Sequence, residues 1–373
     1  MKAVILAGGE GTRLRPLTCT VPKSMVPVLN RPFLEHVLAR LAAQGVSEAV
    51  LALYHLPEAV RQYFGDGRSL GLRLSYSIEE RPLGTAGAVT KVEDSLKETF
   101  GVLNGDIFTD LDLPMVVAYH RERKSKATIV LTPVEDPSPY GVVETDPQGR
   151  VLRFREKPRS DEMSTLWVNA GTYVLEPEVL ARAPRGEPFS FEYGLFPRLI
   201  EAGVPVYAYR SSAYWMDLGT PRNYLALHRH LLLGRAALPL LGPPLRAGVW
   251  AGEGCTLHPS AQVRGPLLLG KGCHVGAGVR LTGPAVLGDG CAVEEEASVQ
   301  GAVLWAGARV GPRAAVSRSV MGRQAQVEEG ASVEGCILGD GVVVGAGYRL
   351  ERGMAVWPGI RLAPGAVSFT TLE

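Results

Sequence analysis

The sequence predicts an α/β fold: a doubly wound, Rossmann-like and mainly parallel sheet, followed by a left-handed parallel β-helix of hexapeptide repeats. Three features of the 373 residues indicate this arrangement. Short apolar runs alternate with helical segments in the first half, and a glycine-rich turn follows the first run. In the second half an aliphatic residue recurs every six positions. We expect a first domain over residues 1–235 and a β-helix domain over residues 236–373.

The first half alternates between strand-like and helix-like segments. Strands are expected over residues 2–6, 49–54, 72–78 and 100–103. A helix is expected over residues 32–44, opened by Asn30 and a proline and closed by Gly45. Further along, residues 146–149 (Asp-Pro-Gln-Gly) predict a hairpin turn between strands at 141–144 and 150–155.

The second half follows a different period. From about Pro239, the stretch LPLLGPPLRAG indicates a connection rather than the interior of an element. Aliphatic residues then recur every six positions from Leu257 to Leu362, with three slips of one residue. This period fits neither an amphipathic helix nor simple strand alternation. It is typical of a parallel β-helix, in which three hexads complete a triangular coil, and about six coils fit the repeat.

Three cysteines support the coil length. Cys255, Cys273 and Cys291 are spaced by 18 residues, one full coil, so we expect them to stack inside the β-helix. In that position a cysteine acts as a small buried hydrophobe rather than as a metal or redox group.

Composition and charge exclude several classes of function. The formal charge is +1, with 39 basic and 38 acidic residues, which provides no general attraction for nucleic acid or an anionic membrane. Five cysteines without a CxxC pair give no zinc or disulfide signature. We find neither a signal peptide nor an apolar run of membrane-spanning length. These features predict a cytoplasmic protein that binds any anion locally.

The stretch VILAGGEGTRLRPLT, residues 4–18, places glycines directly after a buried strand. Without a Cβ, Gly8, Gly9 and Gly11 would let backbone N–H groups approach phosphate oxygens, and Arg13 would add positive charge. Ligands of open parallel sheets bind beyond the carboxyl ends of the strands, where this turn is expected. The pattern is neither a P-loop nor a dinucleotide fingerprint, since Leu14 stands at the third glycine position. A purely structural turn is the alternative.

Two charged residues favour a ligand over a structural turn. Lys23, held by Pro22, is well placed to neutralise a leaving phosphate. Asp106 follows Gly105 at the end of an apolar strand, so its carboxylate is expected in the same crevice as the glycines. For Asp106 alone, an ordinary surface aspartate is the alternative.

These residues belong to a longer series of motifs. In order they are LAGGEGTRLRPLT, VPKSMVPV, ERPLGTAGA, VLNGD, YGVV, FREKP, VNAGTYV and YWMDLGTP. On these motifs the chain resembles the sugar-1-phosphate nucleotidylyltransferases, also called sugar-nucleotide pyrophosphorylases, over nearly its whole length. Many members also carry a hexad-repeat domain.

The resemblance implies the reaction. An oxygen of a sugar-1-phosphate attacks the α-phosphorus of a nucleoside triphosphate in line, and pyrophosphate leaves. No covalent enzyme intermediate is expected, so catalysis consists of positioning and of charge stabilisation around Mg²⁺.

The resemblance also implies the roles of individual residues. The nucleotide would be bound by Leu6, Gly8, Gly9, Gly11, Glu79, Gly84 and Thr85; the catalytic cations would be Arg13 and Lys23; the catalytic carboxylates and Mg²⁺ ligands would be Asp106 and Asp217; and the sugar phosphate would be bound by Gly141, Glu156, Lys157, Asn169 and Gly171. Among these, Glu156 would accept from hexose hydroxyls and Lys157 would pair with the sugar's phosphate. An ordinary exposed ion pair is the alternative for those two residues.

Glu79 bears on the choice of base. It stands five positions before Gly84, where thymidylyl and uridylyl members tend to carry glutamine. A carboxylate only accepts, which suits the adjacent N1–H and N2–H₂ donors of guanine, and a mismatch costs about 1 to 3 kcal/mol. The chain therefore resembles most the GDP-mannose pyrophosphorylase branch, with GTP and mannose-1-phosphate as substrates. If Glu79 points to solvent, the backbone reads the base, and a glucose-1-phosphate thymidylyl- or uridylyltransferase is the alternative.

Two alternative functions lie outside this class: an additional activity in the β-helix, and a regulatory protein without catalytic activity. His258 and His274 allow an additional acyltransferase activity in the β-helix. A non-catalytic regulatory protein that binds a sugar nucleotide should have lost Lys23, Asp106 or Asp217, and all three are present. Otherwise we expect the β-helix to serve homo-oligomerisation or regulation.

Overall fold

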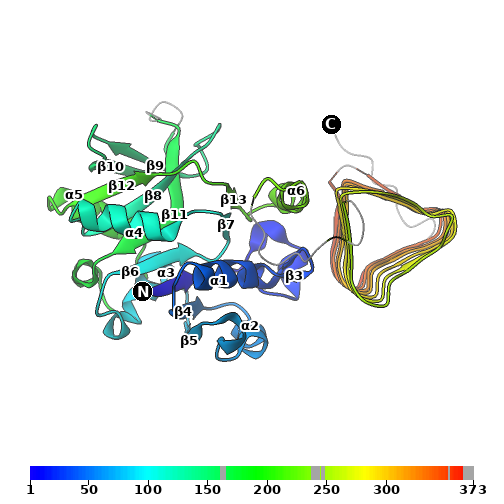
Figure 1. The fold of residues 1–373 in the computed structure, drawn as a ribbon, viewed down its shortest axis with the longest axis horizontal. Coiled ribbons are helices and arrows are strands. Elements are labelled where there is room, and N and C mark those ends of the chain that lie inside the picture. The colour runs from blue at the N-terminus through cyan, green and yellow to red at the C-terminus, as the bar shows by residue number, and fades with distance from the viewer. Residues whose placement is uncertain (160–164, 237–243, 245–247, 352, 364–373) are drawn as a thin grey trace. The chain divides into compact units, whose positions relative to one another are not determined.

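The computed structural model describes residues 1–159, 165–236, 244, 248–351 and 353–363. In the first half, nine strands form one mixed sheet with the order β10-β9-β11-β6-β1-β4-β5, and β8 lies between β11 and β12 (Figure 1). The strands are β1 (Lys2–Leu6), β4 (Glu48–Leu53), β5 (Arg73–Ile78), β6 (Phe100–Asn104), β8 (Ala127–Pro133), β9 (Gly141–Thr145), β10 (Val151–Glu156), β11 (Trp167–Leu175) and β12 (Val206–Arg210).

Strands β6, β1, β4 and β5 run parallel, as the alternation of strands and helices predicts. The interiors of β1, β4 and β6 are buried on both sides, which explains their continuous apolar runs in the sequence, whereas β5 alternates between exposed and buried residues. The four predicted strands and the hairpin β9–β10 are confirmed. Strand β11 pairs antiparallel with β6, β8 and β9, and the sequence pattern does not predict this change of direction.

Six α-helices accompany the strands: α1 (Phe33–Ala43), α2 (Pro57–Phe64), α3 (Gly84–Thr90), α4 (Leu113–Glu122), α5 (Phe196–Glu201) and α6 (Pro221–Leu232), counted over the described residues. The helix predicted over residues 32–44 is α1, and Gly45 ends it with a φ of 82°. Helix α4 starts where the Asp112 side chain accepts from the Met115 N–H at 3.1 Å. Helices α4 and α5 pack on the antiparallel part of the sheet, and α2 and α3 contact β5 and β1.

Two short pairs stand apart from the large sheet. Strand β7 (Ile107–Thr109) pairs antiparallel with β13 (Trp215–Asp217), and β2 (Pro27–Val28) pairs with β3 (Arg31–Pro32). The first of these pairs determines the position of Asp217 and is described with the site.

The second half is a parallel β-helix, seen nearly end-on as a triangle in Figure 1. One side consists of β14 (Val249–Ala251), β17 (Leu267–Leu269), β20 (Ala285–Leu287), β23 (Val303–Leu304), β26 (Val320–Met321), β29 (Ile337–Leu338) and β32 (Ala355–Val356). The next consists of β15 (Thr256–Leu257), β18 (His274–Val275), β21 (Ala292–Val293), β24 (Arg309–Val310), β27 (Gln326–Val327), β30 (Val343–Val344) and β33 (Arg361–Leu362). The third consists of β16 (Gln262–Arg264), β19 (Arg280–Thr282), β22 (Ser298–Gln300), β25 (Ala315–Ser317), β28 (Ser332–Glu334) and β31 (Arg349–Leu350).

The hexad prediction is confirmed by the strand register. Leu257 lies opposite Val275, and Val275 opposite Val293, so the aliphatic residues stack from coil to coil. Cys273 and Cys291 are fully buried in this core, and Cys255 packs against it. Burial raises the pKa of both buried thiols to about 12, which suits inert packing groups.

The three slips of the hexad count all fall at one corner of the triangle. In the long coils this corner contains two residues, as at Gly283-Pro284 between β19 and β20. In the short coils the register leaves one residue fewer at this corner, since Thr282 pairs with Gln300 and Val286 with Val303. A residue with positive φ makes the turn there, at Gly301, Arg318 and Gly335. A left-handed residue shortens the corner by one position and keeps the aliphatic stack in phase.

Backbone contacts divide the chain into two compact units. The first contains residues 1–10 and 34–217, and the second contains residues 11–33 and 218–373. The segment after the glycine turn, Gly11–Phe33, therefore belongs to the unit of the β-helix. The predicted boundary at residues 235 and 236 stays a prediction, and most of LPLLGPPLRAG lies outside the described residues.

Specific contacts hold residues 11–33 in the second unit. The Trp305 indole N–H donates to the Tyr224 hydroxyl at 2.9 Å, and that hydroxyl donates to the Pro27 carbonyl. The Asn30 amide donates to the Leu287 carbonyl at 2.8 Å. Helix α6, which carries Tyr224, thus links the β-helix to this segment.

A membrane-spanning helix is not found in the described part of the chain, where every helix is too short or too polar to cross a bilayer.

Candidate active site

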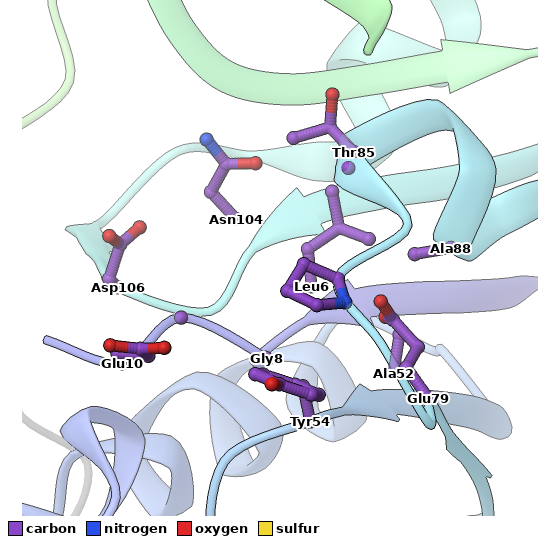
Figure 2. Close-up of a pocket in the computed structure, with 13 residues that line it drawn as sticks. Leu6, Gly8, Glu10, Ala52, Tyr54, Glu79, Thr85, Ala88, Asn104 and Asp106 are labelled. Carbon is purple, nitrogen blue, oxygen red and sulfur yellow. The ribbon is translucent and has the colours of Figure 1, made fainter. Parts of the chain in front are cut away.

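A cavity of about 390 Å³ lies beyond the carboxyl ends of β1, β4 and β6 in the first unit. This volume suits a nucleotide-sized ligand. Its lining is formed by Leu6, Gly8, Gly9, Glu10, Ala52, Tyr54, Glu79, Pro82, Gly84, Thr85, Ala88, Asn104 and Asp106. Figure 2 shows the carboxylates of Glu10 and Asp106 toward one end of this pocket and Glu79 toward the other.

The glycine turn forms part of the pocket wall. A Cβ on Gly9 would meet no atom within 4 Å, so this backbone is open to the cavity. A Cβ on Gly8 would lie 3.3 Å from the Cβ of Tyr54. The Gly105 N–H donates to the Leu6 carbonyl at 2.8 Å, which holds the loop of Asp106 against the end of β1. Leu6, Gly8 and Gly9 are therefore gathered as expected, and their contact with phosphate stays a prediction.

Three other predicted residues of the triphosphate site lie in the second unit. Gly11 has a φ of 65°, and a Cβ there would lie 2.9 Å from the Cβ of Lys23. Lys23 is buried in a 3₁₀ turn, whereas Arg13 is exposed in another. Their roles toward the triphosphate stay predictions.

Glu79 is buried, with 8% of its surface exposed, and it lines the pocket. The alternative in which it points to solvent is wrong, because the end of β5 turns the side chain inward. Its Oε2 accepts from the Leu83 N–H at 2.8 Å. Burial raises the pKa of the Glu79 carboxyl, and the Leu83 N–H and the charge of Lys91 partly oppose that rise.

Gly84 and Thr85 begin α3 beside the pocket. Gly84 has a φ of 70°, and a Cβ there would lie 2.8 Å from the Phe189 carbonyl oxygen, so only glycine fits. The Thr85 hydroxyl donates to Glu192 Oε2 at 2.7 Å and accepts from the Phe191 N–H at 2.8 Å.

The pairing of β7 with β13 brings the backbone of Asp217 close to that of Asp106, the other predicted metal ligand. Asp217 pairs with Ile107, the residue after Asp106, although 111 residues separate the two aspartates. Asp217 is buried and Asp106 lines the pocket. Mg²⁺ commonly binds one or two carboxylates together with waters and substrate phosphates, so this donor set fits the ion. No cluster of three or more His, Cys, Asp or Glu occurs among the described residues.

The predicted sugar wall includes the hairpin β9–β10. Gly141 pairs with Glu156, and a Cβ on Gly141 would lie 2.6 Å from Glu156 Oε2, so glycine makes room for this carboxylate. Burial and then the charge of Glu192 raise the pKa of Glu156, while Lys157 lowers it. Lys157 is exposed and has a φ of 47°.

Asn169 and Gly171 lie at an irregularity in β11. The Gly171 N–H donates to Asn169 Oδ1 at 3.0 Å. Gly171 has a φ of 69°, and a Cβ there would lie 2.6 Å from Asn104 Nδ2. Since Asn104 lines the pocket, the predicted sugar wall borders that pocket directly.

Sequence reasoning missed several residues of the site. Glu10, Ala52, Tyr54, Pro82, Ala88 and Asn104 line the pocket, and Glu192 contacts Thr85. Asn104 Oδ1 is buried without a hydrogen-bond partner in the described structure, so it is an acceptor that a ligand could satisfy. Its position at the end of β6 was a usable signal, whereas nothing in the sequence marks Glu192.

In the β-helix, His258 and His274 are exposed. Their Nδ1 atoms each lie 2.8 Å from a hydroxyl, of Ser260 and Thr256 respectively. These local contacts are typical of surface residues and do not favour an acyl-transfer base.

The fold and the pocket thus define an α/β protein with a pocket beyond a glycine turn at the strand ends. Residues 2–233 match the family described as nucleotidyl transferase, and residues 246–350 match the left-handed β-helix (LbH) domain of EIF2B subunit epsilon. The first match covers more than half of the chain, so the chain belongs to the nucleotidyl transferase family and carries a C-terminal LbH domain.

Similar proteins define the kind of transfer. The chain is 38% identical over 371 residues to a mannose-1-phosphate guanylyltransferase of Mycobacterium tuberculosis, covering 99% of this chain and 98% of that protein. It is 35% identical to a UTP–glucose-1-phosphate uridylyltransferase of Synechocystis, covering 84% and 85%. The structure of HddC from Yersinia pseudotuberculosis complexed with GMP-PN is similar over 61% of this chain and 97% of that one, with 30% identity and a TM-score of 0.53. The chain is a sugar-1-phosphate nucleotidylyltransferase.

Proposed function

We propose that the enzyme joins GTP to mannose-1-phosphate, forming GDP-mannose and pyrophosphate. The observation that carries this proposal is Glu79, a buried carboxylate at one end of the pocket. Its Oε2 already accepts from Leu83, and its remaining lone pairs can only accept. Guanine offers two adjacent donors to such a group, and uracil or thymine offers one donor flanked by acceptors. The guanylyltransferase relative supports the same assignment.

The other residues divide between the triphosphate and the sugar. The open backbone at Gly9 would approach the phosphates, and Lys23 and Arg13 would stabilise the charge of the leaving pyrophosphate. Glu156 would accept from sugar hydroxyls, while Lys157 would pair with the sugar's phosphate. Holding the phosphate oxygen of the sugar-1-phosphate in line with the α-phosphorus would add the contribution of positioning to that of charge stabilisation.

Asp106 and Asp217 would hold a Mg²⁺ ion. The pairing of β7 with β13, in which Asp217 lies opposite the residue after Asp106, supports this assignment of two hard oxygen donors. When bound, the ion supplies positive charge for the transferred phosphoryl group.

The uridylyltransferase relative makes a pyrimidine nucleotide the second candidate. Pyrophosphate release should therefore be measured with GTP, dTTP, UTP and ATP, each against mannose-1-phosphate and glucose-1-phosphate. We expect the highest kcat/KM with GTP and mannose-1-phosphate. A higher value with UTP or dTTP would overturn the role of Glu79, and a preference for glucose-1-phosphate would overturn the assigned sugar.

The β-helix is proposed to form a homo-oligomer. Light scattering of the full chain should give a mass that is a multiple of 39.9 kDa, and a monomer at micromolar concentration would contradict this.

A further inference from the structure

We propose that Glu192 is a positioning residue that connects the nucleotide side of the pocket to the sugar side through a directed chain of hydrogen bonds. The inference rests on the proposed function and adds a residue that sets affinity for the sugar-1-phosphate. Glu192 lies in a π-helical turn, Phe191–Leu195, a conformation found frequently at functional sites.

The Glu192 carboxylate receives two hydroxyl protons. Oε2 accepts from Thr85 at 2.7 Å, and Oε1 accepts from Tyr173 at 3.3 Å. Because an ionised carboxylate cannot donate, both hydroxyls must point their protons toward it. The Thr85 oxygen is thereby turned to accept from the Phe191 N–H, and the Tyr173 oxygen is left as an acceptor.

The chain continues into the predicted sugar wall. Tyr173 is fully buried, and its oxygen accepts from Asn169 Nδ2 at 2.7 Å. At the other end of the amide, Oδ1 accepts from the Gly171 N–H at 3.0 Å, and a backbone N–H can only donate. The amide of Asn169 is therefore held in one orientation from both sides. Its second Nδ2 proton remains available to donate to a sugar hydroxyl.

Glu192 also acts on the second residue of the sugar wall. Its charge is close enough to Glu156 to raise the pKa of that carboxyl, in addition to the effect of burial. One side chain thus influences the donor at Asn169 and the acceptor at Glu156. Through Thr85 it also contacts the lining of the nucleotide pocket.

Glu192→Gln tests the direction of this chain because it keeps the size of the side chain and removes one acceptor. The glutamine oxygen should stay with Thr85, since that contact is the shorter one and the Thr85 oxygen already accepts from Phe191. The glutamine NH₂ then faces Tyr173, whose proton must turn toward the Asn169 donor. We expect the KM for the sugar-1-phosphate to rise about tenfold, with the KM for the nucleotide and kcat changed less than about threefold.

Two further variants complete the experiment. Glu201→Gln, at the exposed end of α5, is the matched control and should leave all constants unchanged. Tyr173→Phe removes the intermediate hydroxyl in an isosteric way. If Glu192 acts through Tyr173, the double variant Glu192→Gln with Tyr173→Phe should raise the sugar KM no more than the larger single effect.

The assays should use the nucleotide and sugar-1-phosphate that the wild type turns over fastest. If the proposed base or sugar is wrong, the substrate preference of the wild type will show it. The test of Glu192 is then carried out with the substrates that the wild type prefers. The positioning role is overturned by an unchanged sugar KM in Glu192→Gln or by effects that multiply in the double variant. Equal losses for both substrates, with a lower melting temperature, would also overturn it, because they indicate a general loss of structure.

Discussion

In the proposed function, the buried side chain of Glu79 determines the preference among bases. It combines an acceptor-only group, low exposure and one oxygen already occupied by the Leu83 N–H. A glutamine at this position could keep the contact with Leu83 through its oxygen and place an NH₂ in the pocket. In the proposed function, the base preference therefore depends on which atoms of residue 79 face the cavity.

Glu79→Gln should lower the ratio of kcat/KM for GTP over UTP about tenfold or more, because the amide donates to a pyrimidine carbonyl and repels the guanine donors. The ratio is measured by pyrophosphate release. Glu80→Gln, on the exposed neighbour, is the control and should leave the ratio unchanged. An unaltered ratio in Glu79→Gln would show that the base is read elsewhere.

The pH dependence of the Glu79 charge has a definite sign. Burial raises the pKa of this carboxyl in the folded protein, so the folded state favours the neutral form. The neutral Glu79 carboxyl therefore stabilises the folded state at a pH below the pKa that this group has in the unfolded chain. This stabilisation is lost as the pH rises through its pKa in the folded protein. Glu79→Gln removes the free-energy cost of burying a charged carboxylate, so it should not lower the melting temperature at neutral pH.

At the scale of elements, the short pair β7–β13 brings distant parts of the sequence together. Asp217 has no sequence neighbour that marks it as a partner of Asp106, yet the antiparallel register places it opposite Ile107. The irregularity in β11 acts similarly, since Gly171 lets that strand approach Asn104. Both features lie next to residues that line the pocket, Asp106 and Asn104.

Asp217→Asn should lower kcat by on the order of a hundredfold or more, because the amide cannot supply the negative charge that would hold Mg²⁺ in the proposed function. Turnover is measured at saturating Mg²⁺, and circular dichroism should show an unchanged fold. Asp112→Asn is the control, since asparagine also caps the start of α4. Full activity in Asp217→Asn would remove this residue from the metal site.

At the scale of the whole molecule, the chain crosses between the two compact units three times, after residues 10, 33 and 217. Residues 11–33 leave the unit of the sheet and are held in the unit of the β-helix. The contacts run from Trp305 through Tyr224 to Pro27. The β-helix therefore stabilises the segment that carries Lys23.

Trp305→Phe should destabilise the second unit by about 1 to 3 kcal/mol, because it removes a buried hydrogen bond and leaves a small cavity. The measurement is the midpoint of thermal unfolding. Trp305 is 2% exposed and Trp357 is 53% exposed, so Trp357→Phe is the matched control with little expected effect. Equal shifts in the two variants would contradict the anchoring role of Trp305.

The sequence by itself determined the two fold classes and the first part of the pocket. Hydrophobic period is a local property, so alternating runs predicted the parallel strands and the hexads predicted the β-helix. The glycine turn and the end of β6 were also visible, because strand ends in an open sheet share one edge.

Only the tertiary structure decided the pairing of Asp217 beside Asp106, the inward orientation of Glu79, the attachment of residues 11–33 to the β-helix and the contacts of Glu192. Each depends on strand register or on packing between segments far apart in the chain. Such contacts arise from the burial of whole elements, and neither period nor composition encodes which side chains then meet.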